Sequence, residues 1–140
     1  MQIDPNNHVV KLCAQGMEME GQGQPEKASA LFLQAWNEST TTFEKFTSAH
    51  YVARHQPRVA DKLQWDEIAL QFAMQINDGT VDGLLPSLYL NVAKCYEDLN
   101  DFALAKLHYE KALAACSSLA TDSYGNMIRA GVLKGIDRVR

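Results

Sequence analysis

The fold is decided by residues 91–113, which read NVAKCYEDLNDFALAKLHYEKAL. The segment has the pattern of two amphipathic helices joined by a two-residue turn at Asn100-Asp101. Small residues and aromatic residues stand where two paired helices would interlock: Ala93, Ala105, Ala112, Tyr96, Phe102 and Tyr109. A helical hairpin of this kind cannot bury its apolar face alone, so the segment predicts neighbouring hairpins of the same kind.

Turn signals divide the rest of the chain into further helical blocks. Gly21-Gln22-Gly23-Gln24, Gln56-Pro57 and Asn77-Asp78-Gly79 are the breaks. We expect helices over about 6–21, 25–38, 41–55, 57–76, 84–99, 102–117 and 122–139. They make three hairpins, over about 6–38, 41–77 and 84–117, followed by a last helix. The sequence therefore predicts one all-α domain over its 140 residues.

Two of the hairpins resemble tetratricopeptide repeats, which are helix–turn–helix units of about 34 residues. The third hairpin offers Tyr89, Val92-Ala93, Tyr96, Ala105, Tyr109 and Ala112 at the characteristic steps. The first hairpin offers Leu12, Gln15-Gly16, Met19, Ala28, Phe32 and Ala35, and Gly23 and Asn100 both fall in the turn. The resemblance implies a right-handed α–α superhelix, a solenoid of three hairpins closed by a C-terminal helix.

The middle hairpin departs from the repeat pattern. The separation between Ala28 and Ala105 exceeds two periods of roughly 34 residues by about nine residues. Its first helix keeps Ala49 and Val52 in register, whereas Trp65, Ile68 and Ala69 of its second helix do not match. The closing proline of the family is absent from all three hairpins.

The last helix resembles the solvating cap that ends such arrays. Its Gly131 and Gly135 are one helical turn apart and share a helix face. Each glycine costs about 1 kcal/mol relative to alanine in an exposed helix. We expect close packing on the preceding helix to compensate, and a flexible or kinked end is the alternative.

The resemblance also implies where a partner would bind, because the first helices of such hairpins line a concave groove. The positions that the resemblance assigns to this groove include Met17, Phe43, Phe46, His50, Arg54, Leu90, Lys94 and Glu97. This mixture of apolar and charged side chains suits a peptide or a partner protein. Cys13 and Met17 stand where a clamp for a C-terminal carboxylate would need Lys and Asn, so that clamp is not expected.

A pocket for a small anionic ligand is the alternative function. His50 and Arg54 are neighbours on one helix face and could bind a carboxylate or phosphate, with Trp65 as a wall. The competing interpretation is structural. In it, His50 packs against the groove, Arg54 pairs with an acidic residue of a neighbouring helix, and Trp65 belongs to the core.

Composition and motifs argue against several other functions. The net charge of −4 disfavours binding to nucleic acid or to an anionic membrane surface. The histidines and cysteines lack metal-ligand spacing, and no nucleophile or acid–base pair is placed by a motif, so we expect no metal, cofactor or enzymatic activity. Cys13, Cys95 and Cys116 are expected to be buried, reduced thiols of a cytoplasmic protein. A second copy filling the groove of the first is a further possibility.

Overall fold

The structure is a computed structural model in which residues 4–140 are described. It is all-α, with no β-strand among these residues. The helices are α1 (His8–Gly21), α2 (Pro25–Glu38), α3 (Thr42–Ala53), α4 (Val59–Met74), α5 (Leu85–Asp98), α6 (Phe102–Ala115) and α7 (Ser123–Arg138), with a short 3-10 helix at Cys116–Ser118. Each predicted helix is confirmed, with ends that differ slightly from the predicted ones.

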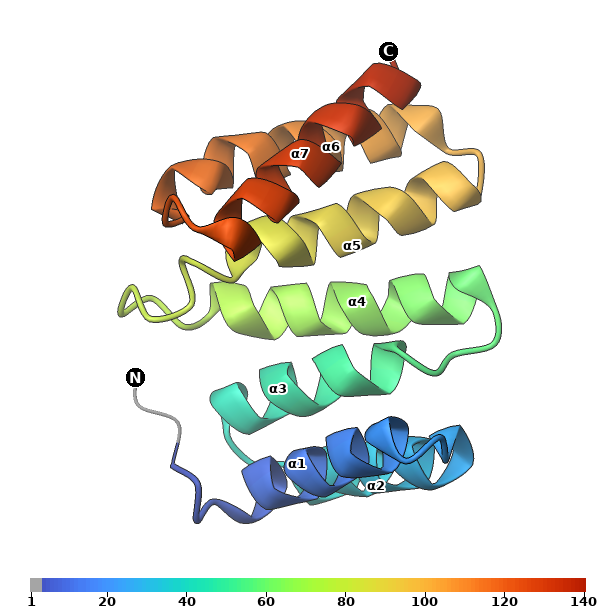
Figure 1. Cartoon of the computed structure of the whole chain (residues 1–140), viewed down its shortest axis with the longest axis vertical. Coiled ribbons are helices and arrows are strands. Elements are labelled where there is room, and N and C mark those ends of the chain that lie inside the picture. Colours follow the sequence, from blue (N-terminus) through green and yellow to red (C-terminus); the bar gives the residue numbers. More distant parts are fainter. Residues whose placement is uncertain (1–3) are drawn as a thin grey trace. The chain divides into compact units, whose positions relative to one another are not determined.

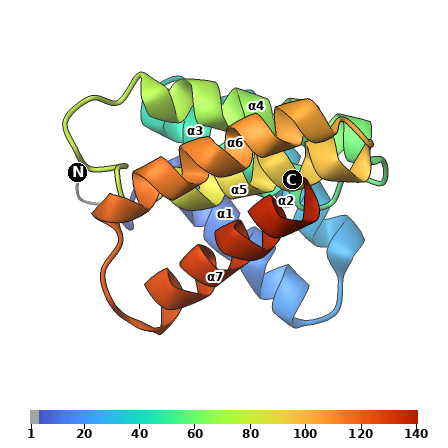
Figure 2. The ribbon, with the colours of Figure 1, turned by 90° about the horizontal axis from the view of Figure 1, so that it is seen from above.

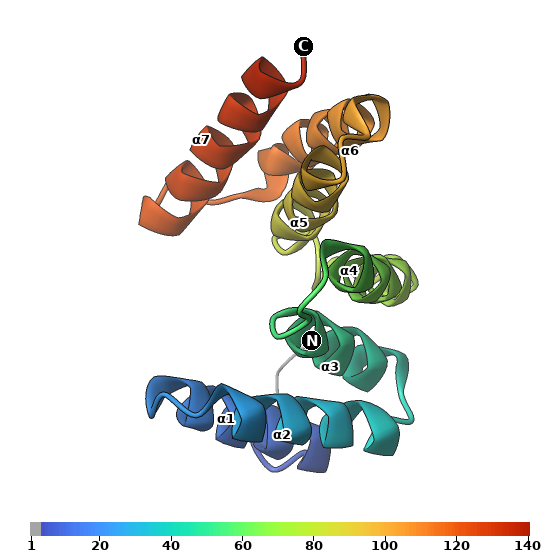
Figure 3. The ribbon, with the colours of Figure 1, turned by 90° about the vertical axis from the view of Figure 1, so that its right-hand side faces the viewer.

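The chain divides into two compact units, residues 1–76 and residues 77–140. In the unit of residues 1–76, α1 pairs with α2, α3 pairs with α4, and α3 also lies against α1 and α2 (Figure 1). In the unit of residues 77–140, α5 pairs with α6, and α7 lies against both of them (Figures 2 and 3). The prediction of a single domain stays a prediction.

The α1–α2 and α5–α6 hairpins share one geometry, with helices of equal length and turns of equal length. The backbone N–H of Gln24 donates to the carbonyl of Met19 at 2.9 Å, and Asp101 donates to Tyr96 at the same distance. Gly23 and Asn100 have φ values of 73° and 64°, in the left-handed region that such a helix end requires. The two turns predicted from the sequence therefore have the same hydrogen bond and the same left-handed residue.

The predicted packing positions of these two hairpins are confirmed except for Phe102, whose side chain is 50% exposed and does not interlock the helices. Their second helices each bury an Ala–aromatic–Ala triad completely: Ala28, Phe32, Ala35 and Ala105, Tyr109, Ala112. Alanine allows the paired helices to approach, and the ring fills the space beside it. Gly16 shows how close this approach is, because a Cβ built there would lie 2.2 Å from the Phe32 ring.

The middle hairpin keeps this arrangement with different residues. Its first helix begins with a capping box between Thr41 and Glu44, as its threonine-rich start predicts. On α4 the triad spacing is met by Asp66, Leu70 and Ala73, all of them buried. The first position of the triad on α4 is therefore Asp66 and not Trp65. A carboxylate stands at this position, whereas the other two hairpins have alanine there.

One of the two glycines of α7 is closely packed, as expected. A Cβ built on Gly135 would lie 2.2 Å from the Tyr109 ring of α6, and one on Gly131 would lie 3.4 Å from Leu90 of α5. Close packing therefore accounts for Gly135, whereas a Cβ on Gly131 would make only an ordinary van der Waals contact with Leu90.

Candidate functional site

The predicted groove residues belong to both units. Met17 lies on α1, Phe43, Phe46 and His50 lie on α3, Arg54 ends α3, and Trp65 lies on α4. Leu90, Lys94 and Glu97 lie on α5. Each of the two sets belongs to its own unit.

Arg54 is held by a carboxylate of α1. Its Nη1 donates to Oε1 of Glu20 at 2.9 Å, and its guanidinium lies 4.8 Å from the centre of the Tyr51 ring. The second oxygen of Glu20 lies 2.7 Å from Nε2 of His55. The structural interpretation of Arg54 is therefore confirmed, since the residue pairs with an acidic residue of a neighbouring helix.

Phe32 of α2 joins these residues to the core. Its ring stacks with the rings of Tyr51 and His55, at centroid distances of 5.1 and 5.8 Å. Tyr51 and His55 are one helical turn apart in sequence, so Phe32 contacts both the last turn of α3 and the segment after it. This stack fixes His55 and Tyr51 around the Glu20 carboxylate.

His50 is largely buried at the start of the last turn of α3. Burial is the main cause that lowers the pKa of His50, Arg54 lowers it further, and the carboxylate of Asp66 opposes both. Its ring meets that of Tyr51 edge-on at 5.3 Å. Nδ1 has no hydrogen-bond partner among the described residues. His50 is therefore a neutral, packed side chain near physiological pH.

The aromatic residues predicted for the groove differ in their surroundings. Phe46 is buried, and the half-buried Phe43 meets it edge-on. The Trp65 ring meets the Trp36 ring at 5.0 Å, and Lys45 places its ammonium 4.4 Å from the Trp36 ring. Trp65 thus joins α4 to α2 in an aromatic cluster, which is the structural role considered for it.

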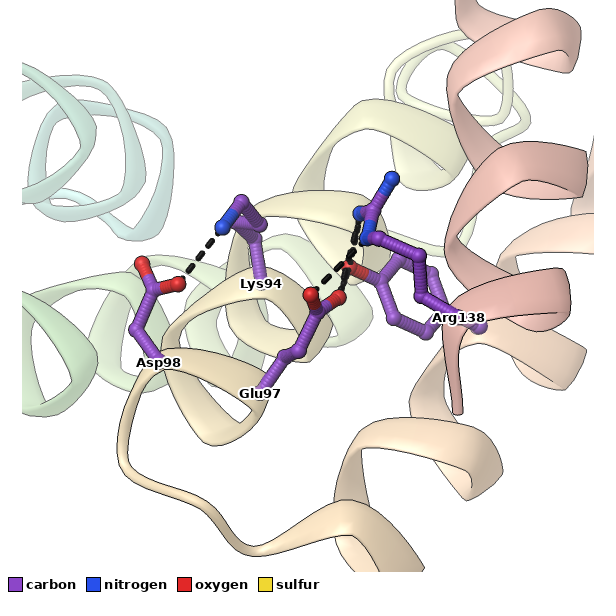
Figure 4. Close-up of polar contacts among 5 residues, drawn as sticks. Lys94, Glu97, Asp98 and Arg138 are labelled. Carbon is purple, nitrogen blue, oxygen red and sulfur yellow. Dashed lines mark hydrogen bonds and ion pairs between the residues drawn. The ribbon is translucent and has the colours of Figure 1, made fainter. Parts of the chain in front are cut away.

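In the second unit, Glu97 is bound from two sides (Figure 4). Arg138 of α7 donates from Nε to Oε2 at 2.8 Å and from Nη2 to Oε1 at 3.0 Å. The Tyr109 hydroxyl donates to Oε1 at 2.7 Å. The Arg138 hydrogen bonds hold the pKa of Glu97 below its usual value, whereas burial and the Glu97 carboxylate raise the pKa of Tyr109 to about 12.

The other two predicted residues of α5 have simpler roles. Lys94 pairs with Asp98 one turn later at 2.5 Å, on the surface of α5 (Figure 4). Leu90 is half-buried and packs against the core formed with α6 and α7.

The contacts of Tyr51, Tyr109 and Arg138 with the candidate site residues were not predicted from the sequence. A signal for the pairing was present, because Glu20 and Glu97 occupy matching positions in the two hairpins that resemble each other. Arg54 follows Glu20 by one repeat length of roughly 34 residues. An acidic residue near the end of a first helix, with arginine at the end of the next such helix, predicts the contact.

A shallow pocket of about 330 Å³ is lined by Pro25, Glu26, Ser29 and His55. Among residues 4–140 no three His, Cys, Asp or Glu side chains gather as a metal site would require, and none of the helices has the length and apolarity to cross a bilayer.

The three thiols are buried and unbridged, as predicted. Burial raises the pKa of Cys13 to about 11, so this thiol is protonated at neutral pH.

Comparisons with protein-family models, with curated proteins and with solved structures give no match.

Proposed function

We propose that the chain is a non-enzymatic interaction module of the tetratricopeptide-repeat kind, whose first helices bind a peptide or an extended segment of a partner protein. One observation carries the proposal. The α1–α3 surface holds an exposed arginine in a fixed orientation beside exposed and half-buried apolar groups.

Arg54 supplies the polar part of this surface. Its side chain is 44% exposed although it is bound to Glu20, and the bond that joins them uses a single guanidinium nitrogen. A guanidinium has five N–H donors, so most of them remain for a carbonyl or carboxylate of a ligand. The contact with Tyr51 holds the group in place before binding, which lowers the entropic cost of association.

Met17 and Tyr51 supply the apolar part. Met17 is 40% exposed and lies one helical turn beyond Cys13, which packs in the cluster that also contacts Tyr51. Methionine adapts its shape to different apolar partners, which suits a peptide-binding surface. The surface therefore favours an extended segment with an apolar side chain near an acidic group.

The alternative ligand, a small free anion, is less well served. An anion bound to Arg54 would lie close to the Glu20 carboxylate, because Arg54 already binds that carboxylate. The two negative charges would repel each other. A ligand that also brings apolar contacts can offset this repulsion.

Selection from a random-peptide display library on the purified chain tests the proposal. Selected peptides should bind wild type, and Arg54→Ala and Met17→Glu should each weaken binding by about tenfold or more, equivalent to about 1.4 kcal/mol. Arg140→Ala, which removes an exposed arginine of the second unit, is the matched control and should bind as wild type does. Peptides that bind both Arg54→Ala and Met17→Glu unchanged would place the binding surface elsewhere.

A further inference from the structure

Helix α6 exposes several large apolar side chains beside the charged residues Lys106, Glu110 and Lys111. Ala105, Tyr109 and Ala112 face the core of the unit and are fully buried. Four further large apolar side chains of the same helix remain well exposed: Phe102 at 50%, Leu104 at 37%, Leu107 at 43% and Leu113 at 42%. Exposed apolar side chains gathered on one element can mark a surface that binds another protein.

The repeat itself does not require these exposed residues. In α2, which has the same length and turn, Phe102, Leu104 and Leu107 are replaced by Pro25, Lys27 and Ala30. The buried positions of the two helices agree, with Phe32 in α2 and Tyr109 in α6. The apolar outer face is therefore particular to α6 and adds nothing to the packing within its hairpin.

Of the four exposed apolar residues, Leu107 lies on a narrow stripe that has small residues at both ends. Ala103, Leu107 and Ala114 are exposed and follow one another at steps of one and two helical turns, so they lie along one line of the helix. Alanine at each end allows another helix to approach closely, and Leu107 lies between them. The charged residues Lys106 and Glu110 lie on one side of this stripe, and the exposed Lys111 lies on the other.

We propose that a second copy of this chain binds to the outer face of α6, so that the two α6 helices pack side by side in opposite directions. A two-fold axis brings the same edge of the stripe together from both copies. Near the axis, Lys106 of each copy then lies opposite Glu110 of the other, which gives two ion pairs from one contact. A parallel pair would instead bring opposite edges of the stripe together, so Lys106 and Glu110 of one copy would not meet those of the other.

The two charges are available for this contact. Neither Lys106 nor Glu110 forms an ion pair within 4.0 Å among residues 4–140, although they are one turn apart on the helix. The α6 stripe belongs to the second unit and the peptide-binding residues belong to the first, so either proposal can fail while the other holds.

Sedimentation equilibrium of the full chain, from about 10 μM to about 500 μM, tests the proposal by mass action. Wild type should move from 15.6 kDa towards twice that mass with rising concentration. Leu107→Glu should keep the chain monomeric, because it places a charge at the centre of the stripe. The matched control is Leu33→Glu on α2, at another exposed leucine (46%), which should associate as wild type does.

A charge exchange tests the antiparallel arrangement. Lys106→Glu and Glu110→Lys should each weaken self-association by about tenfold or more, because each sets like charges opposite one another twice. An equimolar mixture of the two variants should associate again, since both contacts then join glutamate to lysine. The double variant should also recover self-association.

Far-UV circular dichroism confirms that each variant is folded. A wild type that stays at 15.6 kDa over the whole range overturns the proposal. Association that persists in Leu107→Glu, or a mixture that gains nothing over its components, overturns it equally.

Discussion

Glu20 and Glu97 occupy the same position in α1 and α5, and each binds an arginine at the end of the helix that follows its hairpin. Glu20 receives one nitrogen of Arg54 at 2.9 Å and a ring nitrogen of His55 at 2.7 Å. Glu97 receives two nitrogens of Arg138 at 2.8 and 3.0 Å and the hydroxyl of Tyr109. The two units therefore use the same acid–arginine contact with different second donors, and the contact in the second unit is bidentate.

Arg138→Ala should destabilise the second unit more than Arg54→Ala destabilises the first. Removing Arg138 leaves the mostly buried Glu97 with Tyr109 alone, and losing charge-assisted hydrogen bonds costs about 1.5–3 kcal/mol. Arg54 uses a single nitrogen, so its loss should cost roughly half as much. Urea unfolding gives both free energies. A larger loss in Arg54→Ala would contradict the different geometries of the two contacts.

The capping box of α3 should make stability depend on acid pH. Hydrogen bonds from Thr40 and Asn7 lower the pKa of Glu44 from 4.5 to about 2. A carboxyl group with a lowered pKa in the folded state stabilises the fold above its unfolded pKa, and this contribution is lost as pH falls from about 4.5 to about 2. Glu44→Gln should therefore be less stable than wild type at pH 7.

Urea titrations of Glu44→Gln and wild type at several pH values provide the measurement. The difference in unfolding free energy between them should shrink as the pH approaches 2. A difference that stays constant with pH would show that the Glu44 charge does not contribute.

Gly131 and Gly135 should respond oppositely to alanine. Gly135→Ala forces a Cβ to within 2.2 Å of the Tyr109 ring, and overpacking of this kind costs about 1–3 kcal/mol. Gly131→Ala meets Leu90 at 3.4 Å, so the gain in helix propensity, about 1 kcal/mol at most, can dominate. Thermal melting of the two variants measures both changes in stability. An equal loss of stability in the two variants would contradict the prediction.

The three cysteines should be unreactive in the folded chain. All are buried, and the pKa of Cys13 is about 11, so little thiolate is present at pH 8. The folded chain should react slowly with a chromogenic disulfide reagent in buffer. In denaturant all three thiols should react rapidly. Rapid labelling of one thiol in the folded chain would show that the helix carrying it opens, and mass spectrometry would identify the labelled cysteine.

The helices and the packing of the outer hairpins were predictable, because their turn residues and Ala–aromatic–Ala spacing follow local rules. The middle hairpin was harder. Asp66 is 3% exposed, and a carboxylate at a core position gives no apolar signal, so the register of α4 could not be recognised from hydrophobicity. The pairing of Arg54 was among the predicted alternatives, but the role of Tyr109 depends on Gly135 in the next helix, which leaves room for its ring.

The equal lengths of the α1–α2 and α5–α6 hairpins have a consequence for how the chain could be rebuilt. Residues 8–38 and 85–115 begin, turn and end at matching places, and each presents its glutamate to the helix that follows. Either segment could be transplanted into the other's place without changing the length of the chain or the hydrogen bonding of its turn. The two hairpins are thus equivalent in length and turn geometry. A chain in which they were exchanged would differ from the original in the side chains that each hairpin exposes to solvent.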